Sequence, residues 1–124
     1  MESLNNLQKF YNNKKIFITG HTGFKGTWLS IVLSYLNARI YGYSLSPEKN
    51  SLFRKSKIKN KLSSNIYADI TNMKDLKKKF RSSNPEIVFH LAAQPLVIES
   101  YKNPLNTFNT NIIGTLNLLE CLRN

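Results

Sequence analysis

FITGHTGFKG, residues 17–26, places three glycines at three-residue spacing behind a short apolar run. The apolar run, residues 15–19, is typical of a buried strand, and the residues from Phe24 onward have helical spacing. Glycines in such a turn let the chain turn tightly, let a pyrophosphate approach the backbone and let helix and strand pack closely. The helix start attracts an anion because its N–H groups are unpaired. Gly20, Gly23 and Gly26 therefore predict a dinucleotide phosphate site.

A mononucleotide P-loop and a glycine turn without a ligand are the two rival interpretations of this stretch. The P-loop needs the order G-x-x-x-x-G-K-[ST]. From Gly20 the sequence is GHTGFKGT, so Lys25 precedes Gly26 instead of following it and the motif fails. A turn without a ligand is disfavoured, because the strand, the helix and the length of the unit all agree with nucleotide binding.

Strand-like and helix-like segments alternate along the chain. The strands are short and almost continuously apolar, as when both faces of a sheet are covered. Right-handed crossovers between them predict a doubly wound parallel α/β sheet, with ligands beyond the carboxyl ends of the strands. The predicted strands are 15–19, 39–44, 65–68 and 86–90; the predicted helices are 24–36, 73–80 (capped by Asn72 or Thr71) and 105–122; residues 46–63 are predicted as an irregular loop.

Polar residues after the second and third predicted strands are further ligand candidates. The usual dinucleotide pattern has an acidic residue about 20 residues after the glycines, but here Ser44 stands near that place and the nearest carboxylate is Glu48. Ser44 could bond a ribose hydroxyl, whereas Lys49 or Arg54 could meet a 2′-phosphate, so the residues leave NAD and NADP both open. Asp69 fits either an acceptor for the adenine amino group or a turn aspartate.

The segment HLAAQ, residues 90–94, follows the fourth predicted strand. Its small Ala92 and Ala93 let the backbone pass close to a flat cofactor, although they fit plain packing equally well. His90 is interpreted as a polar group at the strand end.

The net charge of the 124-residue chain is +11, which raises the alternative of a nucleic-acid or other polyanion surface. A solvated surface is favoured, because the basic clusters have few aromatic residues among them and no nucleic-acid motif. The sequence has no apolar run long enough to cross a bilayer and no disulfide or metal framework, since Cys121 is its single cysteine and His21 and His90 lack ligands at metal spacing. A cytoplasmic protein with no metal is predicted. The basic clusters are Lys49, Arg54, Lys55, Lys57, Lys59 and Lys61, and Lys74, Lys77, Lys78 and Lys79.

Taken together, these stretches resemble the extended short-chain dehydrogenase/reductase family. Its loop T-G-x-x-G-F-x-G matches residues 19–26, and its later signatures match DI at 69–70, HLAA at 90–93 and NIIGT at 111–115. Within the family, GYSLSP and AAQPLV resemble the members that dehydrate CDP-linked glucose, although Ile98 stands where these usually have Arg. The resemblance implies NAD as cofactor and a CDP-sugar as substrate. It implies cofactor contacts at Gly20, Thr22, Gly23, Phe24, Lys25, Gly26, Ser44, Asp69, Ile70, Leu91, Ala92, Ala93 and Asn111, and substrate contacts at Gln94 and Ser100.

Members of this family use a Tyr-x-x-x-Lys pair for acid–base chemistry, placed after a fifth strand. The single match here, Tyr11 to Lys15, precedes the first strand. We therefore expect residues 1–13 to be a leading segment and residues 14–124 to be a partial Rossmann domain without a substrate domain or catalytic residues, inactive alone. A homodimer, or a partner chain that supplies the missing half, is an accompanying expectation. The alternative is a binding module without chemistry.

Overall fold

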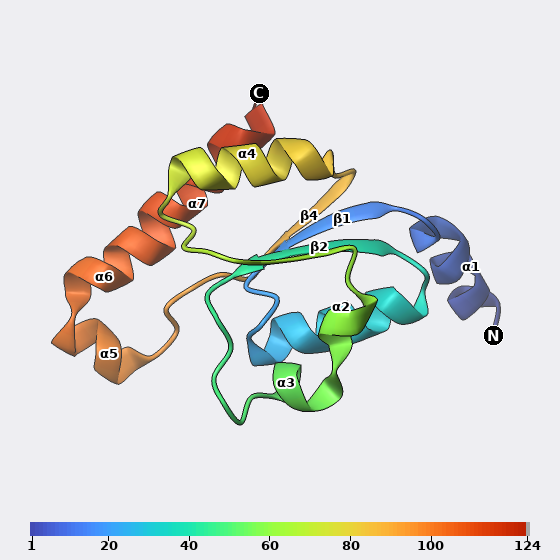
Figure 1. Ribbon diagram of the computed structural model, residues 1–124, viewed down its shortest axis with the longest axis horizontal. Coiled ribbons are helices and arrows are strands. Elements are labelled where there is room, and N and C mark those ends of the chain that lie inside the picture. Colours follow the sequence, from blue (N-terminus) through green and yellow to red (C-terminus); the bar gives the residue numbers. More distant parts are fainter. Residues whose placement is uncertain (124) are drawn as a thin grey trace.

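A computed structural model describes residues 1–123. Its centre is a four-stranded parallel sheet with the strand order β3-β2-β1-β4 (Figure 1). Ile18 of β1 pairs with Gly42 of β2 on one side and with Phe89 of β4 on the other. All four strands run the same way, so their carboxyl ends meet at one edge. The predicted doubly wound parallel class is confirmed. The strands are β1 (Lys15–Thr19), β2 (Arg39–Ser44), β3 (Ser64–Tyr67) and β4 (Ile87–His90).

Helices cover both faces of the sheet and complete a three-layer α/β arrangement (Figure 1). One face carries α2 (Phe24–Tyr35) and α3 (Leu52–Ser56); the other carries α4 (Met73–Ser83) and α7 (Gly114–Arg123). Right-handed β–α–β crossovers produce this placement. The helices that connect β1 to β2 and β2 to β3 lie on one face, and the helix that connects β3 back to β4 lies on the other.

Strand β1 is buried on both faces, and its side chains alternate between two hydrophobic clusters. Phe17 packs with Tyr43, Leu76 and Phe80 under α4 and α7. Ile16 and Ile18 belong to the other cluster, which includes Leu33 of α2 and Ile40 of β2. Successive strand residues point to opposite faces, so the continuous apolar run KIFIT supplies both cores at once.

Helix α4 begins and ends on local signals that the sequence contains. The Asn72 Oδ1 atom accepts a hydrogen bond from the Asp75 amide at 3.1 Å, which satisfies one of the unpaired N–H groups of the first turn. Asn84 closes the helix in the left-handed conformation, with φ of 43°. The predicted cap at Asn72 is confirmed, and the helix runs three residues further than the predicted end at Phe80.

The prediction of an irregular loop over residues 46–63 is wrong. This segment contains helix α3 and the 3-10 turn η1 (Ile58–Lys61). Phe53 and Ile58 are 2% and 4% exposed, so two apolar anchors among many lysines hold the segment on the protein. The Ser51 Oγ atom, at 3.4 Å from the Arg54 amide, caps α3. Because the segment is so rich in charged residues, these two anchors were not recognised from the sequence.

The predicted helix over residues 105–122 is confirmed as a continuous helical stretch that contains one π-helical turn. The structure has α5 (Val97–Lys102), α6 (Pro104–Phe108), the π-helical turn η2 (Asn109–Ile113) and α7. The sheet-facing side of α7 carries Gly114, Asn117 and Leu118, with Gly114 against Ile70: a Cβ on Gly114 would lie 2.5 Å from Ile70 Cγ2. The apolar stripe that suggested the helix is instead half exposed or more: Phe108, Ile112, Leu116, Leu119 and Leu122.

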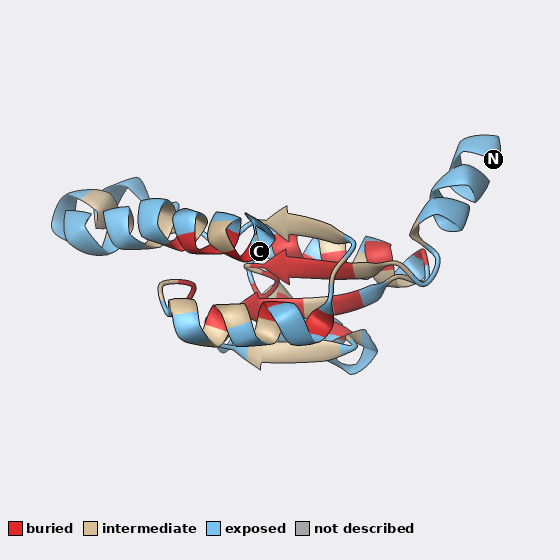
Figure 2. Ribbon diagram, turned by 90° about the horizontal axis from the view of Figure 1, so that it is seen from above, coloured by how far each residue is buried: buried red, intermediate tan, exposed pale blue. Residues whose placement is uncertain are grey.

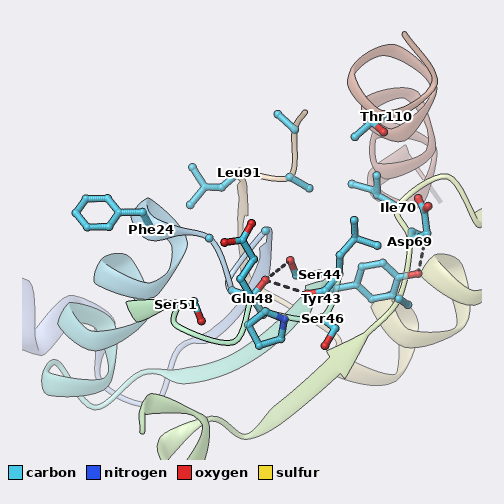
Figure 3. A pocket seen from close by; sticks show the side chains of 18 of the residues that line it. Phe24, Tyr43, Ser44, Ser46, Glu48, Ser51, Asp69, Ile70, Leu91 and Thr110 are labelled. Carbon is cyan, nitrogen blue, oxygen red and sulfur yellow. Dashed lines mark hydrogen bonds between the residues drawn. The ribbon is translucent and has the colours of Figure 1, made fainter. Parts of the chain in front are cut away.

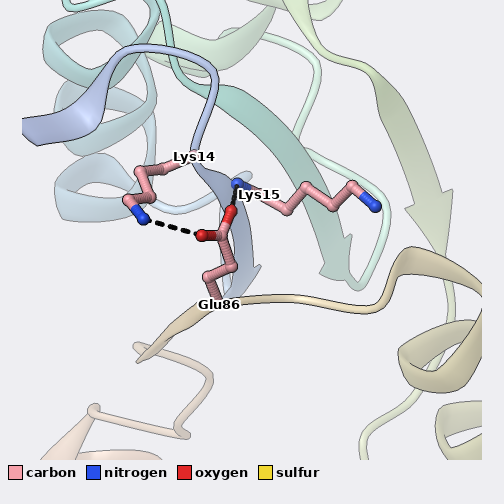
Figure 4. A network of polar contacts seen from close by, with 3 residues as sticks. All are labelled: Lys14, Lys15 and Glu86. Atoms are coloured by element: carbon pink, nitrogen blue, oxygen red, sulfur yellow. Dashed lines mark hydrogen bonds and ion pairs between the residues drawn. The ribbon is translucent and has the colours of Figure 1, made fainter.

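The leading segment forms a helix that the sequence analysis did not anticipate, α1 (Glu2–Tyr11), which projects from the rest of the protein (Figure 2). Just after it, the Glu86 carboxylate bonds the Lys14 ammonium at 2.7 Å and the Lys15 amide at 3.0 Å (Figure 4). These contacts join the starts of β1 and β4. The hydrogen bond from Lys14 lowers the pKa of Glu86.

Candidate functional site

A pocket of about 550 Å³ opens at the carboxyl edge of the sheet (Figure 3). Each of the four strands contributes the loop that follows it, as expected where the strand order of a doubly wound sheet switches. The lining is Gly20, Thr22, Gly23 and Phe24 after β1; Tyr43 to Glu48, Ser51 and Leu52 around the end of β2; Ala68, Asp69 and Ile70 after β3; Leu91, Ala92 and Ala93 after β4; and Thr110.

The three glycines of the loop serve different needs. Gly20 has φ of 74°, and a Cβ there would lie 2.6 Å from the Ala92 amide nitrogen. A Cβ on Gly26 would overlap the Gly20 carbonyl oxygen. Gly23 is exposed, and its Cβ would meet only the Gly20 oxygen, at 3.4 Å. Gly20 and Gly26 are therefore required by the fold, while Gly23 keeps the mouth of the pocket free of a side chain.

Helix α2 presents a bare N-terminus to this pocket. Gly23 is its N-cap, no side chain caps it, and its first turn holds no acidic residue. The first N–H groups of a helix have no partner within the helix and carry a partial positive charge. An anion such as a phosphate is therefore the group that this end can bind.

The formal charge of the pocket lining is opposite to that of the whole protein. The lining contains the carboxylates of Glu48 and Asp69 and no Lys or Arg. Lys25, a predicted cofactor contact, is exposed and lies outside the lining. The Arg54 guanidinium donates to the Pro47 carbonyl at 3.2 and 3.3 Å and to the Glu48 carbonyl at 3.2 Å. Arg54, one of the two cations considered for a 2′-phosphate, is thus occupied in holding the loop after β2, and the other, Lys49, lies outside the lining.

A hydroxyl pair joins the glycine loop to the end of β2. The Thr22 hydroxyl donates to the Leu45 carbonyl at 3.0 Å, and Thr22 Oγ1 lies 2.8 Å from Ser44 Oγ. Because the Thr22 proton is directed to a carbonyl, Ser44 is the donor in the second bond. Ser44 lines the pocket and keeps acceptor lone pairs, and its bond to a ribose hydroxyl stays a prediction.

Asp69 has the turn role that the sequence left open, while its contact with an adenine amino group stays a prediction. Its Oδ1 accepts from the Thr71 amide and from the Thr71 hydroxyl, both at 2.8 Å, which makes it a turn aspartate. It also lines the pocket, beside Ile70. The Tyr43 hydroxyl lies 3.1 Å from both the Asp69 carbonyl oxygen and Asp75 Oδ2. Burial raises the pKa of Tyr43, so its hydroxyl stays protonated and fixes this turn.

Five predicted contacts lie outside the pocket lining: Lys25, Gly26, Asn111, Gln94 and Ser100. Asn111 accepts from the Gln94 amide at 2.8 Å and donates to the Gln94 carbonyl at 3.1 Å, so it pins the chain after β4. The Gln94 side chain in turn donates to Thr107 at 2.9 Å. The Ser100 hydroxyl donates to the Val97 carbonyl at 2.6 Å. Contacts of Gln94 and Ser100 with a substrate stay predictions.

The sequence analysis missed part of the lining. Ser46, Pro47, Ser51 and Leu52 fell in the segment predicted as an irregular loop, and Thr110 belongs to the π-helical turn. A capping serine before an apolar pair could have indicated α3. Nothing in the local sequence indicates the π turn.

Among residues 1–123, no group of three or more His, Cys, Asp or Glu side chains is arranged to hold a metal ion. Over the same residues, no helix combines the length and the apolar character that crossing a membrane requires.

A family model described as GDP-mannose 4,6 dehydratase matches residues 17–124. CDP-glucose 4,6-dehydratase of Salmonella typhimurium is 44% identical over 117 residues, which are 94% of this chain and 32% of that protein. The chain thus spans about a third of the length of this relative.

Solved structures with the same fold include two NAD-bound UDP-glucose 4-epimerases. UDP-glucose 4-epimerase of Thermus thermophilus, in complex with NAD, matches with a TM-score of 0.70 and 26% identity over 87% of this chain and 33% of that one. UDP-glucose 4-epimerase of Stenotrophomonas maltophila, with bound NAD, has a TM-score of 0.77 and 23% identity over 89% of this chain and 33% of that one; it supports the fold alone.

Proposed function

The chain belongs to the GDP-mannose 4,6-dehydratase family, and from this membership we propose that it forms the NAD-binding part of a sugar-nucleotide 4,6-dehydratase. CDP-glucose is the proposed substrate of the complete enzyme, because the relative from Salmonella typhimurium is named for it. The proposed product is CDP-4-keto-6-deoxyglucose, formed with release of water. Another sugar-nucleotide epimerase or dehydratase is the second candidate, because the matched structure from Thermus thermophilus is an epimerase.

The observation that carries the proposal is the bare start of α2 at a pocket without cationic side chains. A pyrophosphate can be held there by backbone N–H groups and the helix dipole. The exposed Gly23 leaves room for it, since a Cβ at that position would stand at the pocket mouth with no protein atom nearer than 3.4 Å. The residues present therefore fit a dinucleotide.

The remaining lining fits the two ends of an adenosine. Ser44 supplies acceptor lone pairs and Glu48 a carboxylate at the end of β2, where ribose hydroxyls would be received. Figure 3 shows the Glu48 side chain projecting into the pocket. Asp69 and Ile70 form the wall after β3, suited to a flat base with an amino group.

We propose NAD over NADP because of the charges at this end of the pocket. A carboxylate accepts from a ribose 2′-hydroxyl but repels a 2′-phosphate. Glu48 provides that carboxylate, and the Arg54 guanidinium, which could have met the phosphate, is bonded to the Pro47 and Glu48 carbonyls. The sequence left NAD and NADP both open, and the charges of the loop after β2 favour NAD.

When bound, NAD supplies the acceptance and return of a hydride, which the dehydration of a hexose at C4 to C6 requires. The described residues hold the coenzyme and form the first wall of the sugar site. We propose that they do not complete the dehydration alone. Tyr11 ends α1 and Lys15 begins β1, at the amino edge of the sheet, whereas the pocket lies at the carboxyl edge. This pair cannot reach a substrate there.

The exposed apolar side of α7 supports the expectation that further protein covers it. Leu116, Leu119 and Leu122 are each at least 50% exposed, and apolar patches of this kind mark surfaces that pack against another chain or segment. Whether a second copy or another chain provides the cover stays a prediction, as does a cytoplasmic location.

Isothermal titration of the chain with NAD, NADP, ADP-ribose and heparin tests the proposal. We expect NAD and ADP-ribose to compete for one site and NADP to bind roughly tenfold more weakly, a difference of about 1.4 kcal/mol. Heparin, a probe for the basic surface, should leave NAD binding unchanged. The variant Lys78→Glu, on the exposed side of α4, is the matched control and should bind NAD like the unmodified chain. Displacement of NAD by heparin, or no NAD binding, would refute the coenzyme site.

A further inference from the structure

His90 is the centre of a continuous hydrogen-bond chain between β1 and the helices after β4. Its Nδ1 atom lies 2.7 Å from Thr19 Oγ1, and its Nε2 atom lies 2.9 Å from Thr115 Oγ1. The Thr115 hydroxyl donates to the Asn111 carbonyl at 2.6 Å. The chain therefore joins the end of β1 to the π-helical turn through one imidazole.

The donors and acceptors of this hydrogen-bond chain are assigned from the partner groups that can only donate or only accept. The Asn111 carbonyl only accepts, so the Thr115 proton points to it and Thr115 Oγ1 accepts from His90 Nε2–H. At the other end, Thr19 Oγ1 accepts from the Leu91 amide at 3.1 Å and the Ala92 amide at 3.2 Å. The Thr19 proton is then left for His90 Nδ1. His90 is thus the neutral tautomer with its proton on Nε2.

Both ends of this hydrogen-bond chain are attached to residues at the pocket. Leu91 and Ala92, whose amides end on Thr19, line the pocket after β4. Asn111, whose carbonyl ends the chain, lies next to Thr110, which lines the pocket from η2. One neutral imidazole therefore fixes two walls of the coenzyme pocket relative to the end of β1.

We propose that His90 is a positioning residue for the coenzyme pocket that functions only as the neutral Nε2–H tautomer, so that its protonation loosens the Leu91–Ala92 wall and weakens coenzyme binding. The binding part of this inference rests on the proposed function; the loosening of the wall does not.

Protonation of His90 is incompatible with this hydrogen-bond chain for a geometric reason. A cationic imidazole donates from both nitrogens, so Nδ1 would direct a proton at Thr19 Oγ1. That oxygen already accepts two amides, and the Thr19 proton would lose its acceptor. The groups that face His90 are the hydroxyls of Thr19 on β1 and Thr115 on α7, and neither is charged.

Burial lowers the pKa of His90 below its ordinary value of 6.5. The change therefore falls on the acidic side of neutrality, and the wall is intact at neutral pH. One pH unit below the midpoint, about a tenth of the molecules keep the competent imidazole, so the apparent Kd for the coenzyme should rise about tenfold.

The first test needs no coenzyme. NMR of the chain labelled with 15N reports the tautomer of His90 directly, together with the amide exchange of Leu91 and Ala92 as the pH is lowered. We expect the Nε2–H tautomer at neutral pH and a loss of protection of the Ala92 amide with the midpoint of the His90 titration. The Leu91 amide also donates to the Thr19 carbonyl at 3.0 Å and should lose less protection. A proton on Nδ1, or amide protection that does not follow the titration, would overturn the proposal.

The second test measures NAD affinity against pH in three chains. In His90→Asn, an amide oxygen that does not titrate takes the place of Nδ1 as acceptor for Thr19; we expect affinity within about threefold of the unmodified chain at neutral pH, and no acid loss. His90→Leu should bind about tenfold more weakly at every pH. His21→Gln removes the other histidine and should keep the acid loss.

The outcomes of the two tests separate the two proposals. An acid loss that persists in His90→Asn would overturn the role of His90. Absence of NAD binding at every pH would refute the proposed function, and the amide titration would still decide whether His90 holds the wall.

Discussion

Gly20 and Ala92 lie so close that a Cβ on Gly20 would stand 2.6 Å from the Ala92 amide nitrogen. This approach brings the end of β1 against the end of β4, and it forms the floor of the pocket below the start of α2. The backbone of Gly20 is also left-handed, with φ of 74°. Position 20 is therefore restricted twice, by conformation and by contact, whereas position 23 is restricted by neither.

Gly23→Ala should separate coenzyme binding from folding. The added methyl group meets only the Gly20 oxygen at 3.4 Å, so the free energy of unfolding should change by less than about 0.5 kcal/mol. The same group stands where a pyrophosphate would approach the helix start, so NAD affinity should fall at least about tenfold. Urea unfolding and calorimetric titration measure the two effects.

Gly20→Ala is the matched comparison for that variant. A left-handed alanine costs about 1–2 kcal/mol, and the contact with Ala92 adds to this, so the unfolding midpoint should fall clearly. Equal NAD affinities for Gly23→Ala and the unmodified chain would contradict the phosphate site at the start of α2.

Glu48 should decide between the two coenzymes. In Glu48→Gln the repulsion of a 2′-phosphate is lost, so the preference for NAD over NADP should shrink by roughly tenfold. Glu48→Arg should bind NADP better than NAD, because a guanidinium pairs with the phosphate. Titration with both coenzymes gives the ratio. Lys78→Gln, on the exposed side of α4 and outside the lining, serves as the control, and an unchanged ratio in Glu48→Gln would contradict the assignment.

Asn72→Ala should destabilise the fold through α4. The Asn72 side chain caps the helix by accepting from the Asp75 amide at 3.1 Å, and loss of such a cap costs about 1 kcal/mol. Denaturant unfolding should show the loss. Lys78→Ala, on the exposed side of the same helix, keeps the cap and should unfold like the unmodified chain. A cap effect near zero would show that tertiary packing alone holds this helix end.

Asn117→Leu should show which side of α7 is the inner one. The Asn117 amide donates to the Ile70 carbonyl at 3.0 Å and to the Thr71 carbonyl at 3.1 Å, and the residue is buried. Two carbonyls would lose their donor, at a cost of about 1–3 kcal/mol. Leu119→Asn, on the half-exposed side, should stay within about 0.5 kcal/mol of the unmodified chain in urea unfolding. The reverse order of the two effects would contradict the helix orientation.

Acid should destabilise the protein through its two histidines. Burial lowers the pKa of both His21 and His90 below 6.5, so the unfolded state binds more protons in the acidic window just below that value. The stability that the two neutral histidines contribute is complete above 6.5, their pKa in the unfolded state. It is lost as the pH falls from there through their lower pKa in the folded state. His21, fully buried and bonded to Asn65 at 2.7 Å, gives a slope of up to about 1.4 kcal/mol per pH unit.

Urea unfolding measures this slope when it is repeated at several pH values above the range in which the carboxylates titrate. In His21→Gln, an amide can still donate to Asn65, and the slope should decrease by the share of His21. A slope that stays unchanged in that variant would show that His21 does not titrate between the folded and unfolded states.

Much of the architecture follows from local sequence, and the errors have identifiable causes. KIFIT predicted a strand buried on both faces, and Phe17 and Ile18 do enter separate clusters. The cap at Asn72 follows from side-chain chemistry alone. The segment 46–63 was misjudged, because two buried side chains, Phe53 and Ile58, outweigh its many lysines.

Part of the candidate site could also be predicted from the local sequence. The glycine loop, Ser44, Asp69 and the alanines after β4 could be found because each follows a strand, and parallel strands bring their ends together. Lys25 lies in the glycine loop and Asn111 in the NIIGT stretch that also matches the family, but both are outside the lining. A motif position fixes a residue along the chain and does not fix where its side chain points.

The sequence by itself determined the strand–glycine–helix unit, the parallel sheet and the edge at which a dinucleotide would bind, because apolar periodicity and the steric needs of glycine act over a few residues. Only the tertiary structure decided which carboxylate faces the pocket, that Arg54 is occupied by backbone carbonyls, and that His90 joins Thr19 to Thr115. Those relationships unite residues far apart in the chain, such as Ala92 and Thr19, which are 73 positions apart. No local pattern encodes them, since they exist only when the strand ends have met.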